Sequence, residues 1–173
     1  MKLKSIIGIL CVLLPSYAMA AELIGRAIEV KSGDTVIIED GNSQRHEIKL
    51  AGIDAPEHGQ PYFHRSQKAL ADEVIGKTLR IHVVGSQPKS RIIGKALHDS
   101  EDINVRQLHL GMAWYDRHDL KHISSLDSTL FAQQERKART KHLGLWRDRN
   151  PVAPWVYRET HAGESRKHAD NIK

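Results

Sequence analysis

The sequence predicts a mainly β, α+β domain in which five short strands close into a small barrel with about three helices. Apolar and polar residues alternate in five short segments, as in half-buried strands. The first connections are hairpin-sized, which argues against a parallel sheet. Three segments between or after the strands have helical apolar spacing. A chain of 173 residues, 40% of them hydrophobic, has room for one such domain and its core.

The domain is predicted to open with three antiparallel strands. Alternation places them roughly at Leu23–Val30, Thr35–Glu39 and Arg45–Leu50. Clusters of turn residues, Ser32-Gly33-Asp34 and Asp40-Gly41-Asn42, separate these strands. We therefore expect a β-meander.

Helices and the two remaining strands follow. Pro61 suits the first position of a helix that ends at Gly76. Alternation then predicts strands over Thr78–Val84 and Arg91–Leu97, and the segment Ile103–Leu110 is typical of a short helix. With the three strands of the meander, this makes five strands for the barrel.

The longest predicted helix covers Ser124–His142. Leu126, Leu130 and Ala138 lie on one stripe of this helix, which we expect to face the core. Gly144 is expected to end the helix at the C′ position, where a left-handed conformation is common.

The first twenty residues are typical of a secretory signal peptide. Lys2 and Lys4 precede an apolar run too short to span a bilayer, and Ala18 and Ala20 are small residues suited to signal cleavage. An uncleaved anchor is the alternative. Cleavage after Ala20 predicts an exported protein, periplasmic or secreted, without membrane contact. It leaves residues 21–158 as the folded domain, and residues 159–173 as a polar tail expected to be disordered.

Three carboxylates stand in two loops beside strand ends. Asp34 lies in the first turn, and Asp54 and Glu57 lie in the loop after the third strand. Two carboxylates offer oxygen ligands to a hard divalent cation, and a third can hold or deprotonate a bound water. Acidic residues are also common in turns without any function. From these residues alone, both interpretations remain open.

A series of short motifs extends over nearly all of residues 22–158. The motifs are Gly33-Asp34-Thr35-Val36, Leu50-Ala51-Gly52-Ile53-Asp54-Ala55-Pro56-Glu57, Gln60-Pro61-Tyr62, Gly94-Lys95-Ala96-Leu97, Asn104, Leu110–Trp114, Glu135–Arg139, Gly144–Trp146 and Pro154–Arg158. In this order and spacing they resemble the staphylococcal nuclease (thermonuclease) family. The resemblance implies an OB-like five-stranded barrel with three helices, and calcium-dependent hydrolysis of DNA and RNA phosphodiesters by attack of water.

The resemblance also implies roles for individual residues. Asp34 and Asp54 correspond to the carboxylates that bind calcium, and the backbone carbonyl of Ala55 corresponds to a further ligand. Glu57 corresponds to the general base or water-orienting residue. All four positions hold the residue type that the family pattern has there, so the resemblance predicts a complete metal and water site.

Two other positions depart from the family pattern, because Lys49 and Lys95 stand where the family has arginines. Lysine keeps the positive charge but loses the planar fork that donates two parallel hydrogen bonds to a phosphate. Arginine at both positions is therefore expected to raise the rate. Ile93 replaces a tyrosine expected to contact the nucleotide, and Ser32 stands where the family often has an aspartate. Arg91 has the strand-face parity of Lys95 and is a further candidate for a phosphate contact.

Two functions are consistent with this pattern. The first is an exported, monomeric, metal-dependent nuclease acting on DNA, RNA or both, slowed by roughly 10²–10⁴ because of the two lysines. The second is a catalytically weak or inactive OB-fold module that binds nucleic acid or another polyanion. The retained carboxylates favour the nuclease, and the two lysines favour the binding module.

Overall fold

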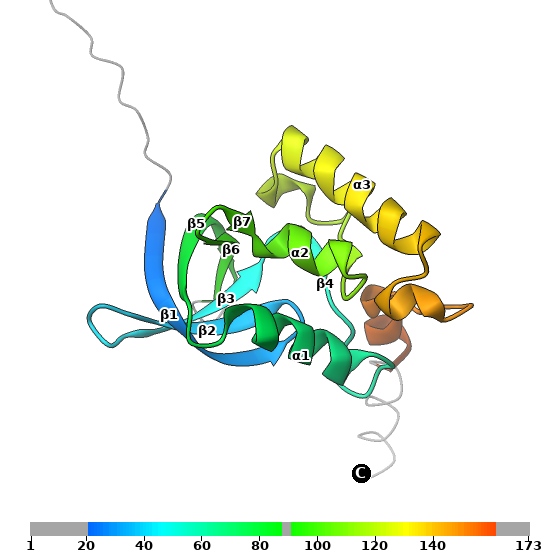
Figure 1. The fold of residues 1–173 in the computed structure, drawn as a ribbon, viewed down its shortest axis with the longest axis horizontal. Coiled ribbons are helices and arrows are strands. Elements are labelled where there is room, and N and C mark those ends of the chain that lie inside the picture. Colours follow the sequence, from blue (N-terminus) through cyan, green and yellow to red (C-terminus); the bar gives the residue numbers. More distant parts are fainter. Residues whose placement is uncertain (1–20, 88–90, 162–173) are drawn as a thin grey trace, which may run out of the picture.

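The computed structural model describes residues 21–87 and 91–161 (Figure 1). The predicted signal peptide, residues 1–20, lies outside the described residues. Residues 162–173 of the predicted tail also lie outside them. Among the described residues, no helix is long and apolar enough to cross a membrane.

Five strands close into a mixed barrel. They are β1 (Glu22–Ser32), β2 (Thr35–Asp40), β3 (Arg45–Leu50), β5 (Thr78–Gln87) and β6 (Arg91–His98). Neighbouring strands pair antiparallel in the order β3-β2-β1-β5-β6, and a parallel pairing of β3 with β6 closes the barrel. The predicted five-stranded, OB-like barrel is thereby confirmed.

Three two-residue strands complete the β structure. β7 (Glu101–Asp102) extends the sheet beside β6, and β4 (Ile53–Asp54) pairs antiparallel with β8 (Trp114–Tyr115). In the second pair, Asp54 lies directly opposite Trp114. This small sheet fixes the position of the loop that carries three of the predicted site residues, Asp54, Ala55 and Glu57.

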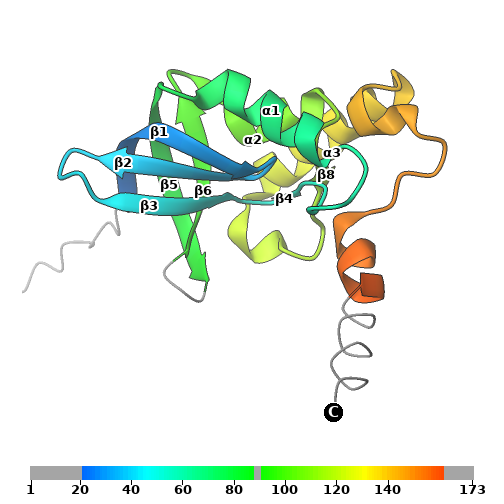
Figure 2. The same ribbon diagram turned by 90° about the horizontal axis from the view of Figure 1, so that it is seen from below.

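Three helices pack on the barrel and on one another. They are α1 (Phe63–Val74), α2 (Ile103–His109) and α3 (Ser125–Thr140). Contacts join α1 to β1, α2 to β6, and α2 to α3, and Figure 2 shows α1 lying along the upper side of the strands. Short 3-10 turns, η2 (Leu120–His122) and η3 (Gly144–Arg147), lie before and after α3.

A fourth helix, which the sequence analysis did not predict, covers residues 154–161. Figure 2 shows it at the β4 end of the barrel, after the loop that follows η3. Its last three residues belong to the segment expected to be a disordered tail, so in residues 159–161 the structure differs from that expectation.

The main core fills the barrel and the space below the helices. It includes Val36, Ile38, Ile48, Leu50, Leu79 and Ile81 from the strands, with Leu70, Leu108 and Phe131 from the helices. A second cluster is formed by Trp114, Ala138, Leu145, Trp146 and Ala153, with Trp155 packed against it. Because burial of each large apolar side chain contributes about 1.5–3 kcal/mol, this second cluster anchors the C-terminal segment to the domain.

The start of α1 differs from the prediction. Pro61 lies two residues before the first helical residue, and Tyr62 precedes the helix in a left-handed conformation with φ 70°. Pro61 therefore belongs to the preceding turn and is not at the first helical position.

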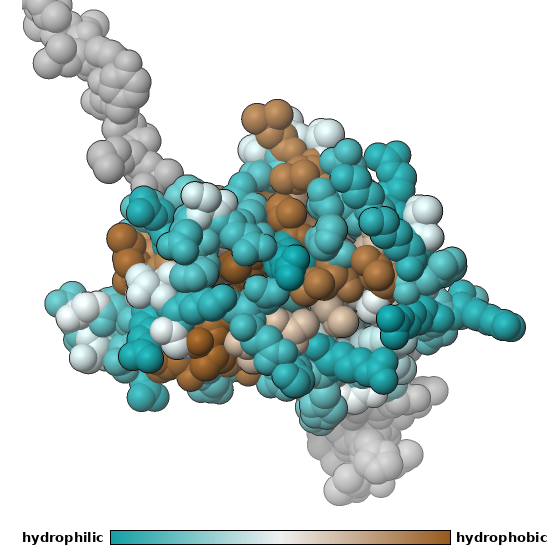
Figure 3. Space-filling view, in the orientation of Figure 1, coloured by the Kyte–Doolittle hydropathy of each residue, from teal (hydrophilic) through white to brown (hydrophobic). Residues whose placement is uncertain are grey.

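The apolar stripe of α3 also differs from the prediction. Its buried residues are Phe131, Glu135 and Ala138, which recur at helical spacing, whereas Leu126 is 84% exposed. Figure 3 shows apolar side chains gathered over the N-terminal end of this helix. Leu126 lies in the first turn of α3 and belongs to neither core cluster, so its side chain stays in contact with solvent.

The C′ residue of α3, two positions after Thr140, is His142 and not Gly144. His142 has φ 50°, its N–H donates to the Arg139 carbonyl (3.0 Å), and the Leu143 N–H donates to the Ala138 carbonyl (2.9 Å). These two bonds form a Schellman motif. Gly144 has a different reason to be glycine, because a Cβ there would lie 2.1 Å from the carbonyl oxygen of Gly111.

Candidate active site

Strand pairing brings the predicted metal ligands together at one end of the barrel. Asp34 lies in the turn between β1 and β2, and its carbonyl accepts a hydrogen bond from the Leu50 N–H at the end of β3 (2.8 Å). Thr35 lies opposite Lys49 in the β2–β3 register. The loop after β3 then turns back and places Asp54 beside them.

Asp34 is a buried carboxylate with four hydrogen-bond donors. Its Oδ1 accepts from the hydroxyls of Ser32 (2.7 Å) and Thr35 (3.1 Å), and its Oδ2 accepts from the Ala55 N–H (2.7 Å) and the Lys49 ammonium. Burial alone would raise the pKa of Asp34, but the Lys49 ammonium and these hydrogen bonds lower it below its usual value. Asp34 is therefore held as the anion.

Lys49 lies between the two aspartates. Its Nζ donates to Asp34 and to the carbonyl of Ile53 (3.1 Å), and it lies 3.7 Å from Asp54 Oδ1. Burial would lower the pKa of Lys49, but the charges of Asp34 and Asp54 raise it above its usual value. The ammonium is thus an internal counter-ion to the carboxylates.

Arg158 is the site residue that the sequence analysis missed. From the helix at residues 154–161 its guanidinium donates to both carboxylate oxygens of Asp54, from Nη2 at 2.8 Å and Nη1 at 3.1 Å. Nη1 also donates to Glu57 Oε1 at 2.5 Å. Burial raises the pKa of Asp54 above its usual value, although Arg158 and Lys49 both act to lower it.

The tryptophan cluster explains how a residue so distant in the chain reaches Asp54. Trp114 lies opposite Asp54 in the β4–β8 pair, and the Trp155 ring packs edge-on against the Trp114 ring with centroids 5.6 Å apart. Arg158 follows Trp155 by three residues, which is nearly one helical turn. The one available sequence signal was the motif Pro154–Arg158, which ends in this arginine.

These side chains line an open cleft of about 570 Å³. Its cationic lining residues are Lys31, Lys49, Arg91 and Arg158, and its acidic ones are Asp34, Asp54, Glu57, Asp116 and Asp119. Arg91, a candidate from strand parity, therefore does reach the cleft, where its Nε donates to Glu47 at 2.5 Å. A cleft with carboxylates at its base and cations around it is suited to a phosphate group held with a cation.

Lys95 is not brought to this cleft. Its ammonium donates to Asp127 Oδ1 on α3 (2.6 Å) and lies 3.1 Å from Asp102 Oδ2, at the start of α2. Burial would lower the pKa of Lys95, but these two carboxylates raise it. Lys95 thus links β6 to α3 and to the start of α2 through these two ion pairs. Ile93 is buried, so neither residue is available to a nucleotide in the cleft.

Comparison with known proteins identifies the family. Residues 47–148 match the family described as staphylococcal nuclease homologue. The chain belongs to the staphylococcal nuclease family.

Several relatives of this staphylococcal nuclease homologue have names that describe nucleases. This chain is 32% identical to an "Uncharacterized endonuclease" of Escherichia coli over 81% of its own length and 88% of that protein. It is 29% identical to one from Haemophilus influenzae, over 77% and 71% of the two chains. A rice protein, "Probable staphylococcal-like nuclease CAN2", is 33% identical over 67% of this chain but 30% of its own length. These relatives support a hydrolytic nuclease function.

The family is generally calcium-dependent, and the donor set of this homologue fits such an ion in kind. Asp34, Asp54 and the Ala55 carbonyl are oxygen donors, as calcium prefers. Every carboxylate oxygen of the two aspartates already accepts a hydrogen bond. Within residues 21–87 and 91–161, no three His, Cys, Asp or Glu side chains are grouped so that they could hold a metal. Calcium would therefore require Arg158, whose side chain is 48% exposed, to turn away from Asp54.

Proposed function

We propose that this protein is an exported, metal-dependent nuclease that hydrolyses phosphodiester bonds of DNA, RNA or both. The observation that carries the proposal is the convergence of Asp34, Asp54 and Glu57 with Lys49 and Arg158 in one cleft. Export rests on the signal-peptide pattern in residues 1–20. The exported chain would then begin at Ala21 and act outside the cytoplasm.

The side chains of the cleft supply the proposed chemistry. Glu57 orients a water and accepts a proton from it as the water oxygen attacks phosphorus and the bond to the leaving oxygen breaks. The leaving oxygen takes up a proton from solvent, which gives an alcohol and a phosphate monoester. Arg158 turns from the carboxylates to the phosphate and donates two parallel hydrogen bonds to its oxygens, where negative charge develops. A calcium ion held by Asp34, Asp54 and the Ala55 carbonyl would neutralise phosphate charge.

One observation favours the alternative of a non-catalytic binding module. Lys49 and Arg158 already neutralise the charges of the two aspartates without a divalent cation. A protein of this kind would bind a polyanion through the cations of the cleft and leave it intact. The two functions therefore predict different results in a cleavage assay.

Cleavage by the purified exported protein tests the proposal. Labelled single- and double-stranded DNA and RNA are incubated with the protein in calcium, in other divalent ions and in chelator. We expect cleavage in calcium and none in chelator. Binding without cleavage in every ion would support the binding module instead. The intact mass of the exported chain, expected to begin at Ala21, tests the export part.

Asp54→Asn is expected to weaken calcium binding by about tenfold or more, because the amide keeps the size of the side chain but removes its negative charge. Titration calorimetry with calcium measures this effect. Asp72→Asn is the matched control, since Asp72 lies exposed on α1 and pairs with Lys68. Equal binding by wild type and Asp54→Asn would contradict the metal assignment.

Lys49→Arg is expected to raise kcat about tenfold, because a guanidinium at the base of the cleft can donate two parallel hydrogen bonds to the phosphate. Lys95→Arg is expected to change kcat less than about twofold, since Lys95, unlike Lys49, does not line the cleft and its ammonium donates to Asp127 on α3. Single-turnover cleavage of a labelled oligonucleotide measures both. An equal gain from Lys95→Arg would show that Lys95 reaches the phosphate.

A further inference from the structure

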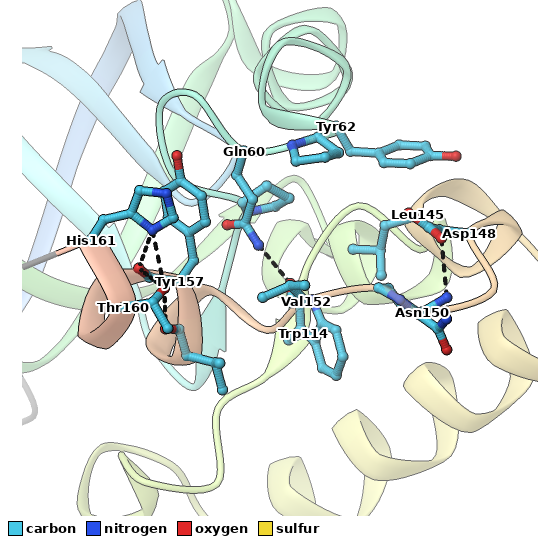
Figure 4. A pocket seen from close by; sticks show the side chains of 14 residues that line it. Gln60, Tyr62, Trp114, Leu145, Asp148, Asn150, Val152, Tyr157, Thr160 and His161 are labelled. Atoms are coloured by element: carbon cyan, nitrogen blue, oxygen red, sulfur yellow. Dashed lines mark hydrogen bonds between the residues drawn. The ribbon is translucent and has the colours of Figure 1, made fainter. Parts of the chain in front are cut away.

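A second cavity, of about 420 Å³, lies beside the cleft between the loop at residues 56–62 and the helix at residues 154–161 (Figure 4). Most of its lining is apolar or aromatic, with Pro61, Tyr62, Trp114, Val152, Val156 and Tyr157 among the lining residues. This size and composition are those of a small-molecule pocket. None of the chemistry proposed for the cleft uses these residues.

The pocket has a preformed wall. The Gln60 side chain is buried, accepts from the Glu57 N–H (2.9 Å) and donates to the Val152 carbonyl (2.6 Å), as the dashed line in Figure 4 shows. This bridge ties the loop at residues 56–62 to the C-terminal segment. Gly59, in the same loop, lies close to the helix at residues 154–161, because a Cβ on Gly59 would lie 2.9 Å from the Tyr157 hydroxyl.

The pocket is continuous with the cleft. Pro56 lines both of them, and the adjacent residues Tyr157 and Arg158 line the pocket and the cleft respectively. Glu57 lies in the cleft, and the Gln60 side chain that bonds its N–H lies in the pocket wall. A ligand that extends from a phosphate at Arg158 along the helix would therefore enter the pocket.

The pocket surface offers flat, apolar contact area. The rings of Tyr157 and His161 stack with centroids 3.8 Å apart and planes 24° apart, and Figure 4 shows this pair at one end of the pocket. Val152 and Val156 are 50% and 42% exposed there. Apolar side chains in contact with water gain free energy when a flat apolar group covers them.

We propose that this pocket binds one base of the nucleic-acid strand whose phosphate lies in the cleft, and this inference rests on the proposed function. In such a strand the bases are the flat aromatic groups, and each lies one sugar away from a phosphate. The charged phosphates have no partner in an apolar pocket, whereas a base covers apolar and aromatic side chains without loss of a charge contact. The pocket thereby selects nucleotides over simple phosphodiesters.

The test uses strands with a single cleavable phosphodiester, all other linkages being neutral methylphosphonates, so that the position of the strand in the cleft is fixed. The base on one side or the other of that phosphate is replaced by an abasic residue. We expect kcat/KM of the wild-type protein to fall about tenfold when the base on one particular side is missing. Removal of the other base is expected to have a smaller effect.

The variant Val152→Asn/Val156→Gln makes the pocket polar without a change of charge. We expect it to lower kcat/KM about tenfold on the strand with both bases, and to leave cleavage of a fully abasic strand unchanged. Its rate should no longer depend on the base that matters to the wild type. Val84→Gln is the matched control, because Val84 is also 42% exposed but lies on β5 outside both cavities.

Each other outcome overturns the inference. If the wild type cleaves all strands equally, the pocket holds no base, while the nuclease function stands. If the variant keeps the base dependence of the wild type, the base binds elsewhere. If it instead shifts the protein from dimer to monomer in size-exclusion chromatography, the face joins two copies of the chain. If no strand is cleaved in any divalent ion, the proposed function fails, and the inference fails with it.

Discussion

Glu57→Gln is expected to lower kcat about 10²–10⁴-fold while the fold is unchanged. Glu57 lies at the cleft with its side chain 37% exposed, so water can reach its carboxylate. Glutamine keeps the size of the side chain and can still accept a hydrogen bond from Arg158, but it cannot take a proton from the attacking water. The loss should therefore appear in the chemical step and leave substrate binding nearly unchanged.

Single-turnover cleavage of a short labelled oligonucleotide in saturating calcium measures this loss. Glu29→Gln is the matched control, since Glu29 is an exposed acid on β1, outside the cleft. Thermal melting of both variants checks that the fold is intact. A kcat for Glu57→Gln equal to that of the control would remove Glu57 from the mechanism.

Arg158→Ala is expected to lower kcat about 10²–10³-fold, the usual effect of removing one donor that stabilises charge in a transition state. Arg158 lies on the helix at residues 154–161, and among the described residues its guanidinium is the only one that contacts both Asp54 and Glu57. Arg158→Lys should fall between Arg158→Ala and wild type, because it keeps the charge and loses the planar fork. Both losses should lie in kcat more than in KM.

The same variants separate two roles for this arginine. If Arg158 only neutralises the carboxylates, Arg158→Ala will bind calcium more tightly and keep its kcat. If it also contacts the phosphate, kcat will fall whatever the calcium concentration. Arg149→Ala is the matched control, because Arg149 is exposed and lines neither the cleft nor the apolar pocket. A rise in kcat for Arg158→Ala would overturn the proposed phosphate contact.

The proximity of Asp34, Lys49 and Asp54 was predictable because these residues lie in neighbouring turns and strands. Asp34 and Lys49 are joined by a hairpin register, and Asp54 follows within five residues of Lys49. Period-two alternation fixes which strand residues share a face, and turn residues fix where the strands end. Strand faces and strand ends are local properties, so they can be predicted from the pattern of residues.

Helix ends were less predictable than helices. Pro61 and Gly144 have the residue types of helix termini. In the structure, however, Pro61 lies in the turn before α1, and Gly144 is a glycine because the Gly111 backbone lies close to it. The stripe of α3 was misplaced because Leu126 has the right period but lies beyond the edge of the core. Residue type limits what a position can do, and packing selects among the remaining choices.

By itself the sequence determined the barrel, the order of its elements and the two loops with Asp34, Asp54 and Glu57, because each follows from local periodicity and turn chemistry. Only the tertiary structure decided which cations face those carboxylates. Lys95 shares a strand face with Arg91, yet Asp127 and Asp102 hold it toward the helices. Arg158 reaches Asp54 across 104 positions because Trp155 packs on Trp114, and burial of these rings is a long-range interaction that no local pattern encodes.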